Sequence, residues 1–266
     1  MDSDVEIAIR AAEAASDVLR AAFRGPVEHY AKEGDDFATQ ADIAAEQAIL
    51  EVISAARPDD RFIAEESGRS GASRADRVWL IDPLCGTRNF AAGTPEVGVN
   101  IALREGNSLK VAAVADPFAG EIFWTAGTGA FARRDGADRP LAPRADSKLV
   151  DIDVDPPYPN RGTFSAGRLF TDDRFMTRFH PRVLSTSLAL VWVAAGRRAA
   201  YLTDGDFRDN VHFSSGIALC RAAGCVVTGL AGEEVLAGAH GLVAAADTAT
   251  HERLLEIIAR QHVTDR

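Results

Sequence analysis

The sequence has few cysteines, no long apolar run and no excess of positive charge. Its three cysteines cannot all pair with one another, which favours free thiols in a reducing compartment. A membrane-spanning helix needs about 18 or more consecutive apolar residues, and the sequence has no such stretch. Asp2, Asp4 and Glu6 lie where a secretory signal carries positive charge. We therefore predict a cytoplasmic protein.

The charge balance is acidic, with 29 Lys and Arg against 39 Asp and Glu and a formal net charge of -10. Nucleic acids and anionic membrane surfaces are bound by clustered Lys and Arg, so both are disfavoured as partners. An anionic substrate would need metal ions or a local basic patch. The hydrophobic content of 47% is typical of globular proteins, and 266 residues suffice for one large domain or two packed lobes.

Apolar periodicity predicts alternating helices and strands. Helices are predicted over Val5–Phe23, Ala41–Ala56, Leu188–Ala195, Gly216–Ala223 and Thr250–Gln261. Strands are predicted over Val78–Ile81, Val97–Leu103, Val111–Ala115, Glu121–Thr125, Cys225–Thr228 and Leu242–Ala245. We expect Asp82 and Pro83 to end the first of these strands. Residues 155–182 are richer in Pro, Gly and Arg, and we place a lobe boundary near residue 145.

Four short motifs carry the residues suited to chemistry. Thr39–Asp42 begins a predicted helix, and Glu65–Ser67 follows an apolar pair that indicates a strand end. Asp82–Phe90 follows a predicted buried strand, and Asn210–Gly216 opens a late helix. Taken singly, their carboxylates are explained as a helix cap, a solvated turn residue and the start of an Asp-Pro turn. Together, in this order, they indicate a site.

These motifs resemble those of the inositol monophosphatase-like family of metal-dependent phosphatases. Residues 82–90 match its signature Asp-Pro-(Ile/Leu)-Asp-Gly-Thr-x-Asn-Phe everywhere except Cys85. Further similarities are Thr39 to Asp42, Glu65-Glu66, Gly127 to Phe131, Ser185 to Arg197 and Gly241 to Ala245. The resemblance implies an α+β protein with the layered α-β-α-β-α sugar-phosphatase fold. Residues 1–145 would form the lobe that carries the metal and catalytic motifs, and residues 146–266 the lobe that completes the substrate pocket.

The resemblance also implies a mechanism. In the family, the residues that match Glu65, Asp82 and the backbone carbonyl of Leu84 hold one Mg²⁺ ion. Those that match Asp42 and Thr87 orient and deprotonate the attacking water. All five are present, so polarisation of a phosphoryl oxygen and delivery of a water remain possible.

Substrate contacts are implied less completely. Phosphate would rest on backbone amides around Gly86 and Thr87, at a helix N-terminus. Ser185 matches a second-lobe position of the family, and Asp204 aligns with a residue that binds ring hydroxyls. Leu184 replaces a glycine, which would narrow the sugar pocket. The substrate is expected to be a small anionic phosphorylated metabolite, and the family is commonly homodimeric.

A second Mg²⁺ site of the family is altered in this chain. It uses the residue that matches Asp82 and two further Asp residues, whose positions are held here by Cys85 and His212. Magnesium prefers oxygen ligands, so we expect one Mg²⁺ ion rather than two. Three interpretations remain open. The protein is a phosphatase with a weakened site, or Asp82, Cys85 and His212 bind Zn²⁺ or a related softer metal, or it has lost catalysis and acts as a binding or regulatory module. Zn²⁺ and Mn²⁺ are the alternative ions to Mg²⁺.

Overall fold

The computed structural model describes residues 2–25, 29–31, 37–72, 76–238 and 240–263. The chain forms two compact units. The first comprises Met1–Pro140, Thr186–Leu188 and Val211–Leu219, and the second comprises Leu141–Ser185, Ala189–Asn210 and Cys220–Arg266. The predicted boundary between residues 145 and 146 is a single cut, whereas the chain returns twice to the first unit after Pro140.

The first unit contains an eight-stranded sheet in the order β10-β9-β8-β7-β6-β5-β3-β4 and a separate β1-β2 pair. Its strands are β1 (His29–Ala31), β2 (Phe37–Thr39), β3 (Arg61–Ala64), β4 (Gly68–Gly71), β5 (Arg77–Cys85), β6 (Gly98–Glu105), β7 (Ser108–Asp116), β8 (Glu121–Thr125), β9 (Phe131–Arg134) and β10 (Ala137–Pro140). Its helices are α1 (Asp4–Ala22), α2 (Gln40–Ala56) and the short α3 (Thr87–Ala91).

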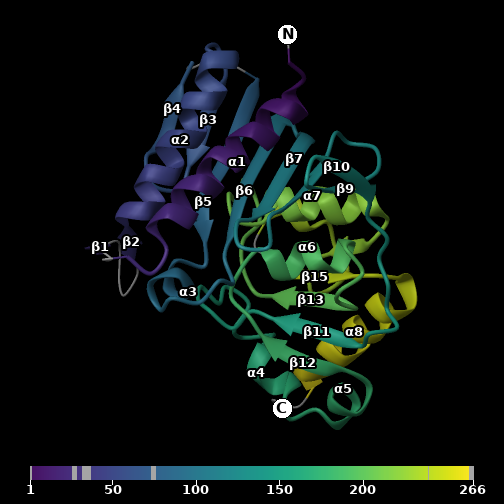
Figure 1. The fold of residues 1–266 in the computed structure, drawn as a ribbon. Coiled ribbons are helices and arrows are strands. Elements are labelled where there is room, and N and C mark those ends of the chain that lie inside the picture. The colour runs from purple at the N-terminus through teal and green to yellow at the C-terminus, as the bar shows by residue number, and fades with distance from the viewer. Residues whose placement is uncertain (1, 26–28, 32–36, 73–75, 239, 264–266) are drawn as a thin grey trace. The chain divides into compact units, whose positions relative to one another are not determined.

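Helices α1 and α2 lie side by side against this sheet (Figure 1). Each begins at a side-chain cap, Ser3 for α1 and Thr39 for α2, that accepts a hydrogen bond from the first turn. Their apolar faces pack on the sheet in one core, which includes Ile49 of α2 and Trp79 of β5. This packing confirms the two predicted helices and fixes the strand that carries the central motif.

Strand β5 differs from its prediction, because it continues through Asp82 and Pro83 to Cys85. Asp82 pairs with Asn100 of β6, and the register shifts before Cys85 pairs with Gly98. Proline has no N–H to donate, and such an irregularity in the ladder accommodates it. Asp82 and Cys85 are therefore held by strand pairing rather than by a turn.

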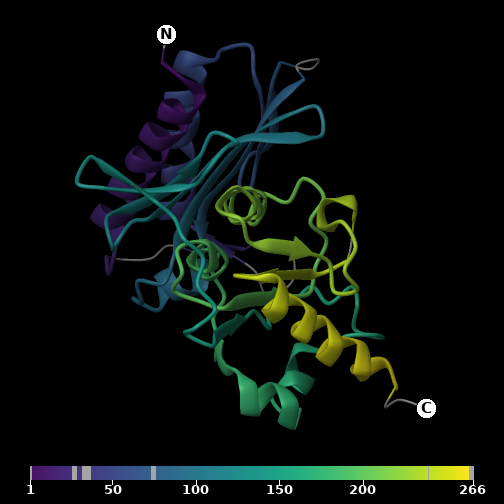
Figure 2. The same ribbon diagram turned by 90° about the vertical axis from the view of Figure 1, so that its right-hand side faces the viewer.

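The second unit contains a five-stranded sheet in the order β12-β11-β13-β15-β14. Its strands are β11 (Leu149–Ile152), β12 (His180–Val183), β13 (Ala200–Thr203), β14 (Val226–Thr228) and β15 (Leu242–Ala245). Its helical segments are α4 (Ala166–Leu169), α5 (Asp173–Arg178), α8 (Thr248–Ala259), η1 (Val235–Ala237) and η2 (Arg260–Val263). Helix α8, yellow in Figure 2, shares a core with β11, β13, β15 and α5.

Two helices belong partly to each unit. Helix α6 (Leu188–Ala194) begins in the first unit, and α7 (Ser214–Ala223) runs from the first unit into the second. The predicted late helices and strands are confirmed within a few residues, but the sequence predicted no elements where α4, α5 and β11 to β13 lie. Within the described part of the chain, no helix is long and apolar enough to cross a membrane.

Asp60 is buried beside the core of the first unit and should contribute strongly to its stability. Its carboxylate accepts hydrogen bonds from Arg77 Nε at 2.9 Å and Trp79 Nε1 at 2.8 Å. Replacing Asp60 by Ala should lower the free energy of unfolding by about 2–4 kcal/mol, because both donors lose their buried partner. Urea denaturation measures this loss, and the exposed neighbour Asp59→Ala should change stability by no more than about 0.5 kcal/mol. Equal losses of unfolding free energy in Asp60→Ala and Asp59→Ala would contradict this stabilising role of Asp60.

Candidate active site

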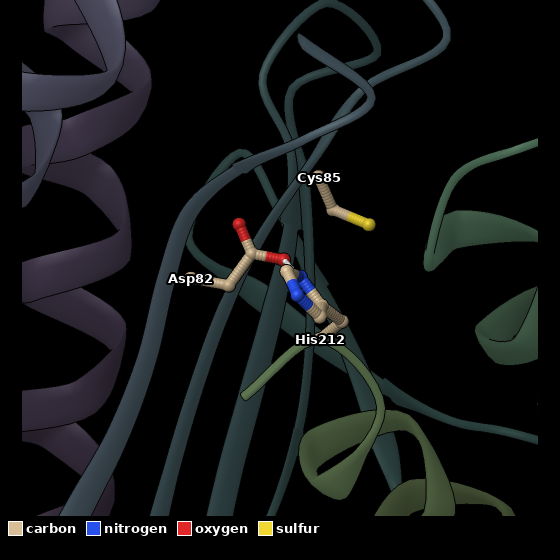
Figure 3. Close-up of side chains that lie close together, drawn as sticks. All are labelled: Asp82, Cys85 and His212. Atoms are coloured by element: carbon tan, nitrogen blue, oxygen red, sulfur yellow. Dashed lines mark hydrogen bonds and ion pairs between the residues drawn. The ribbon is translucent and has the colours of Figure 1, made fainter. Parts of the chain in front are cut away.

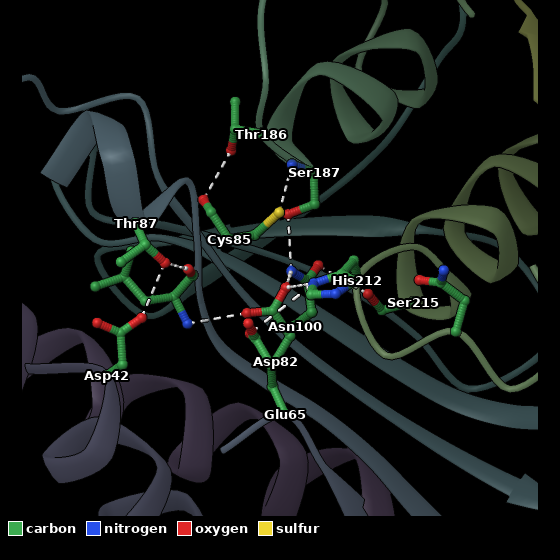
Figure 4. Close-up of polar contacts among 12 residues, drawn as sticks. Asp42, Glu65, Asp82, Cys85, Thr87, Asn100, Thr186, Ser187, His212 and Ser215 are labelled. Carbon is green, nitrogen blue, oxygen red and sulfur yellow. Dashed lines mark hydrogen bonds and ion pairs between the residues drawn. The ribbon is translucent and has the colours of Figure 1, made fainter. Parts of the chain in front are cut away.

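The first unit brings together motifs that are far apart in the sequence. The end of β5 supplies Asp82 and Cys85, the segment Thr186–Leu188 lies beside them, and Val211–Leu219 supplies His212. Gly98 permits the close approach of the second segment, since a Cβ atom there would lie 2.7 Å from Ser187 Oγ. Figure 4 shows these residues together with the Asp42 and Thr87 pair.

Asp42 and Thr87 are in direct contact. Thr87 Oγ1 lies 3.0 Å from Asp42 Oδ1 and 3.2 Å from the carbonyl oxygen of Leu84. The other oxygen of Asp42, Oδ2, accepts hydrogen bonds from the Thr39 N–H at 2.8 Å and the Thr39 hydroxyl at 2.5 Å. The fully buried Asp42 is therefore a helix-capping residue, as its position allows, and also a partner of Thr87.

Asp82 is fully buried and engaged at both oxygens. Oδ1 accepts the Leu84 N–H at 3.0 Å, and Oδ2 accepts the side-chain N–H of Asn100 at 3.2 Å. His212 Nδ1 lies 2.8 Å from the same Oδ2 and 3.9 Å from Glu65 Oε2. The residues matching the two expected Asp positions, Cys85 and His212, thus lie next to Asp82 as predicted from the alignment of motifs (Figure 3).

Cys85 and His212 have unusual protonation behaviour. Burial raises the pKa of the Cys85 thiol to about 11, and the charge of Asp82 adds to this shift. Burial by itself would lower the pKa of His212, but the Asp82 carboxylate and the hydrogen bonds to Asp82 and Cys85 outweigh it. The pKa of His212 therefore lies well above its usual value of 6.5, although 38% of its side chain is exposed. At neutral pH without metal, the site holds a neutral thiol and an imidazolium paired with Asp82.

Asn100 is a site residue that the sequence reasoning missed. Its side-chain N–H groups lie 3.2 Å from Asp82 Oδ2 and 2.8 Å from Ser187 Oγ, and its carbonyl accepts the Ser215 hydroxyl at 3.0 Å. It thereby joins all three chain segments of the site. The signal was present, because Asn100 is the one amide side chain in the apolar run Val97–Leu103.

Glu46 is a second missed residue, and it fixes the turn that carries Glu65. Its nearly buried carboxylate accepts the backbone N–H groups of Glu66 and Ser67, both at 2.8 Å. The Glu65 N–H donates to the carbonyl of Ile81 at 3.0 Å. The position of Glu65 is therefore set by the Ile81 carbonyl of β5 and by the Glu46 carboxylate of α2.

The predicted substrate residues Ser185 and Asp204 belong to the second unit. The Ser185 hydroxyl lies 2.6 Å from Asp155 Oδ2, and Asp204 accepts both the backbone and the side-chain N–H of Asn160. Asp204 lines a hollow of about 270 Å³ with Asp153 and others. Burial raises the pKa of Asp153 to about 6. A part for Ser185 and Asp204 in substrate binding stays a prediction.

The side chains fit a magnesium ion at only one of the two family positions. Glu65, Asp82 and the Leu84 carbonyl offer the hard oxygen atoms that Mg²⁺ prefers. Cys85 and His212, together with Asp82, offer sulfur, nitrogen and one carboxylate, which is a poor set for an octahedral Mg²⁺ site. The first set supports a magnesium ion, and the second does not.

Removing the Asn100 side chain should loosen the site. Asn100→Ala would leave Ser187 and Ser215 without this buried partner, so we expect a loss of about 1–3 kcal/mol in unfolding free energy. Urea denaturation at neutral pH tests this, with the exposed turn residue Asn107→Ala as the matched control. A loss no larger than that of the control would show that the amide does not hold the segments together.

Comparison with known proteins agrees with this geometry. Residues 1–262 match the model of the inositol monophosphatase family. The chain is 34% identical to the Nus factor SuhB of Pasteurella multocida, over 97% of this chain and 96% of that protein. It is 35% identical to an inositol-1-monophosphatase of Caulobacter vibrioides, over 62% of this chain and 66% of that protein, just under two thirds of its length.

Solved structures confirm the predicted α+β sugar-phosphatase fold. The extragenic suppressor protein suhB of Bartonella henselae superposes with a TM-score of 0.82 at 25% identity, over 98% of both chains. An IMPase of Thermotoga maritima superposes with a TM-score of 0.81 at 23% identity, over 96% of both chains, and supports the fold alone. With its motifs, its fold and the match over 1–262, the chain belongs to the inositol monophosphatase family.

Proposed function

We propose that the protein is a metal-dependent phosphomonoesterase that hydrolyses a small anionic phosphorylated metabolite with one magnesium ion. The contact of Thr87 with Asp42, next to the Leu84 carbonyl, carries this proposal. It keeps a buried base within reach of a hydroxyl at the edge of the oxygen-rich set formed with Glu65 and Asp82. Membership of the inositol monophosphatase family supports the reaction class.

Separate residues of this chain would bind the ion and activate the water. Glu65, Asp82 and the Leu84 carbonyl would hold the ion, which when bound supplies Lewis-acid polarisation of a phosphoryl oxygen. Thr87 orients the attacking water, and a proton of that water is transferred toward Asp42. Because Oδ2 of Asp42 is occupied by Thr39, Oδ1 is the oxygen that receives this proton.

The altered half of the site predicts a weak enzyme. The family's second ion stabilises the departing oxygen, and the set at Cys85 and His212 does not fit that ion. The rate of hydrolysis should therefore be reduced most for substrates with a poor leaving group. We expect aryl phosphates, whose leaving groups need little help, to be cleaved better than alkyl phosphates.

A second candidate function is a binding role without catalysis. Several relatives are called Nus factor SuhB, including the one matched over 97% of this chain. The replacement of two second-site carboxylates by Cys85 and His212 fits such a role as well. Absence of hydrolysis with every phosphomonoester tested, in Mg²⁺ or Mn²⁺, would favour this second function. Absence of nucleic acid as a partner, a homodimeric assembly and a cytoplasmic location remain predictions.

Loss of either intact carboxylate should abolish most hydrolysis. Asp42→Asn and Glu65→Gln should each lower kcat by at least about a hundredfold, the size expected for a positioned base or a metal ligand. Steady-state phosphate release measures this. The exposed controls Asp59→Asn and Glu51→Gln should keep the wild-type rate. If both site variants stayed active, the roles given to these residues would be wrong.

Restoring the family carboxylates should strengthen the site. The double variant Cys85→Asp with His212→Asp should hydrolyse phosphate esters faster than wild type in saturating Mg²⁺, and each single variant should gain less. Kinetics combined with calorimetric titration of Mg²⁺ would check this, with a second bound ion expected only in the double variant. A wild-type crystal structure with two fully occupied Mg²⁺ ions would overturn this interpretation.

A further inference from the structure

Asp82, Cys85 and His212 form one compact group of different ligand types. One carboxylate oxygen, the thiol sulfur and an imidazole nitrogen lie within 4.8 Å of one another. Within the described residues, this is the one group of three or more such side chains that could hold an ion. We propose that these three side chains bind a zinc ion, so that a site built for magnesium in the family takes a different metal here.

The chemistry of the three side chains suits zinc. Zinc is bound in proteins by cysteine sulfur, histidine nitrogen and carboxylate oxygen, usually with four ligands in a tetrahedron. Three protein ligands leave a fourth position open, as in zinc sites that act on a substrate. A thiolate and an imidazole bind zinc and similar soft ions far more tightly than they bind magnesium.

The three ligand atoms lie within 4.8 Å of one another, so an ion could bind after some movement of their side chains. Zinc–ligand bonds of about 2.0–2.3 Å at tetrahedral angles would hold the ligand atoms about 3.3–3.6 Å apart. His212 Nδ1 and Asp82 Oδ2 are 2.8 Å apart without an ion, so they must separate by roughly half an ångström. Replacing one direct hydrogen bond by two metal bonds provides the reason for that movement.

The surroundings hold two of the three ligands, Cys85 and Asp82, in place. The Ser187 N–H donates to Cys85 Sγ at 3.2 Å, a contact that stabilises negative charge on sulfur. Asn100 donates to both Asp82 and the Ser187 hydroxyl, so one amide links the supports of two ligands. Hydrogen bonds to the ligands from neighbouring groups are a general feature of protein metal sites.

Asp82 can serve this ion without giving up the other one. Its Oδ1 faces the Leu84 N–H, and its Oδ2 faces His212. Zinc at Oδ2 would leave Oδ1, the oxygen that accepts the Leu84 N–H, for the other ion. The zinc proposal goes beyond the proposed phosphatase function, because it holds whether or not the protein cleaves a phosphate ester.

A direct ion pair between Asp82 and His212 is the competing explanation of the same geometry. It would close the site without metal, with Cys85 as a hydrogen-bond partner of His212 and not as a ligand. The two explanations differ in whether the sulfur of Cys85 becomes a ligand. A measurement that detects a metal–sulfur bond therefore separates them.

Cobalt(II) substitution provides that measurement on the full-length protein. The chain, freed of metal by chelator dialysis, is titrated with Co²⁺ and then with Zn²⁺. We expect one equivalent of Co²⁺ to give a thiolate-to-cobalt charge-transfer band and intense visible bands of a four-coordinate ion, and Zn²⁺ to displace it. Cys85→Ser should remove the charge-transfer band, and His212→Gln should weaken Co²⁺ and Zn²⁺ binding at least about tenfold.

Controls tie the signal to this site. Cys225→Ser replaces another buried thiol of the chain and should keep the full spectrum. Asp42→Asn should also keep it while losing hydrolysis, so failure of the zinc proposal and failure of the phosphatase proposal are distinguishable. A wild-type protein without the charge-transfer band, or a band that survives Cys85→Ser and disappears in Cys225→Ser, would overturn the proposal.

Discussion

The contact between Asp82 and His212, at 2.8 Å, is the interaction on which the rest of this site depends. Asp82 is fully buried, and a buried carboxylate is stable only when it is paired or hydrogen-bonded. The family solves this with metal ions on both sides of the equivalent residue. In this chain, the His212 imidazolium and the Asn100 amide contact Oδ2 of Asp82. The backbone N–H of Leu84 donates a hydrogen bond to Oδ1. When no second ion is bound, the positive charge beside Asp82 comes from the His212 side chain.

The same contact makes metal binding a competition within the protein. An ion at Cys85 and His212 must displace the proton shared by His212 and Asp82 and must remove the proton from a thiol whose pKa is about 11. Zinc, with its strong bonds to nitrogen and sulfur, can meet that demand, whereas magnesium cannot. The oxygen-rich set at Glu65 and Leu84 faces no such barrier. The two halves of the site are therefore suited to different ions.

Completion of the site depends on the return of distant segments to the first unit. Thr186–Leu188 and Val211–Leu219 belong to it although long stretches of the second unit separate them in the chain. Asn100, opposite Asp82 in the β5–β6 pair, binds Ser187 from one segment and Ser215 from the other. A shift of either returning segment would therefore reach Asp82 through this amide, and a shift of Val211–Leu219 would also reach it directly through His212.

The sequence by itself determined the family, the α+β class, the five longest helices and the strands β5 to β8, β14 and β15, because apolar periodicity and a nine-residue motif are local properties. It also predicted that Cys85 and His212 would meet, since both align with ligands of one ion. Only the tertiary structure decided that β5 runs through Pro83 to Cys85, because strand pairing with β6 outweighs the local turn preference of Asp-Pro. The roles of Asn100 and Glu46 were likewise decided there. A buried amide or carboxylate takes its partners from segments that are distant in sequence, and no local pattern specifies which ones.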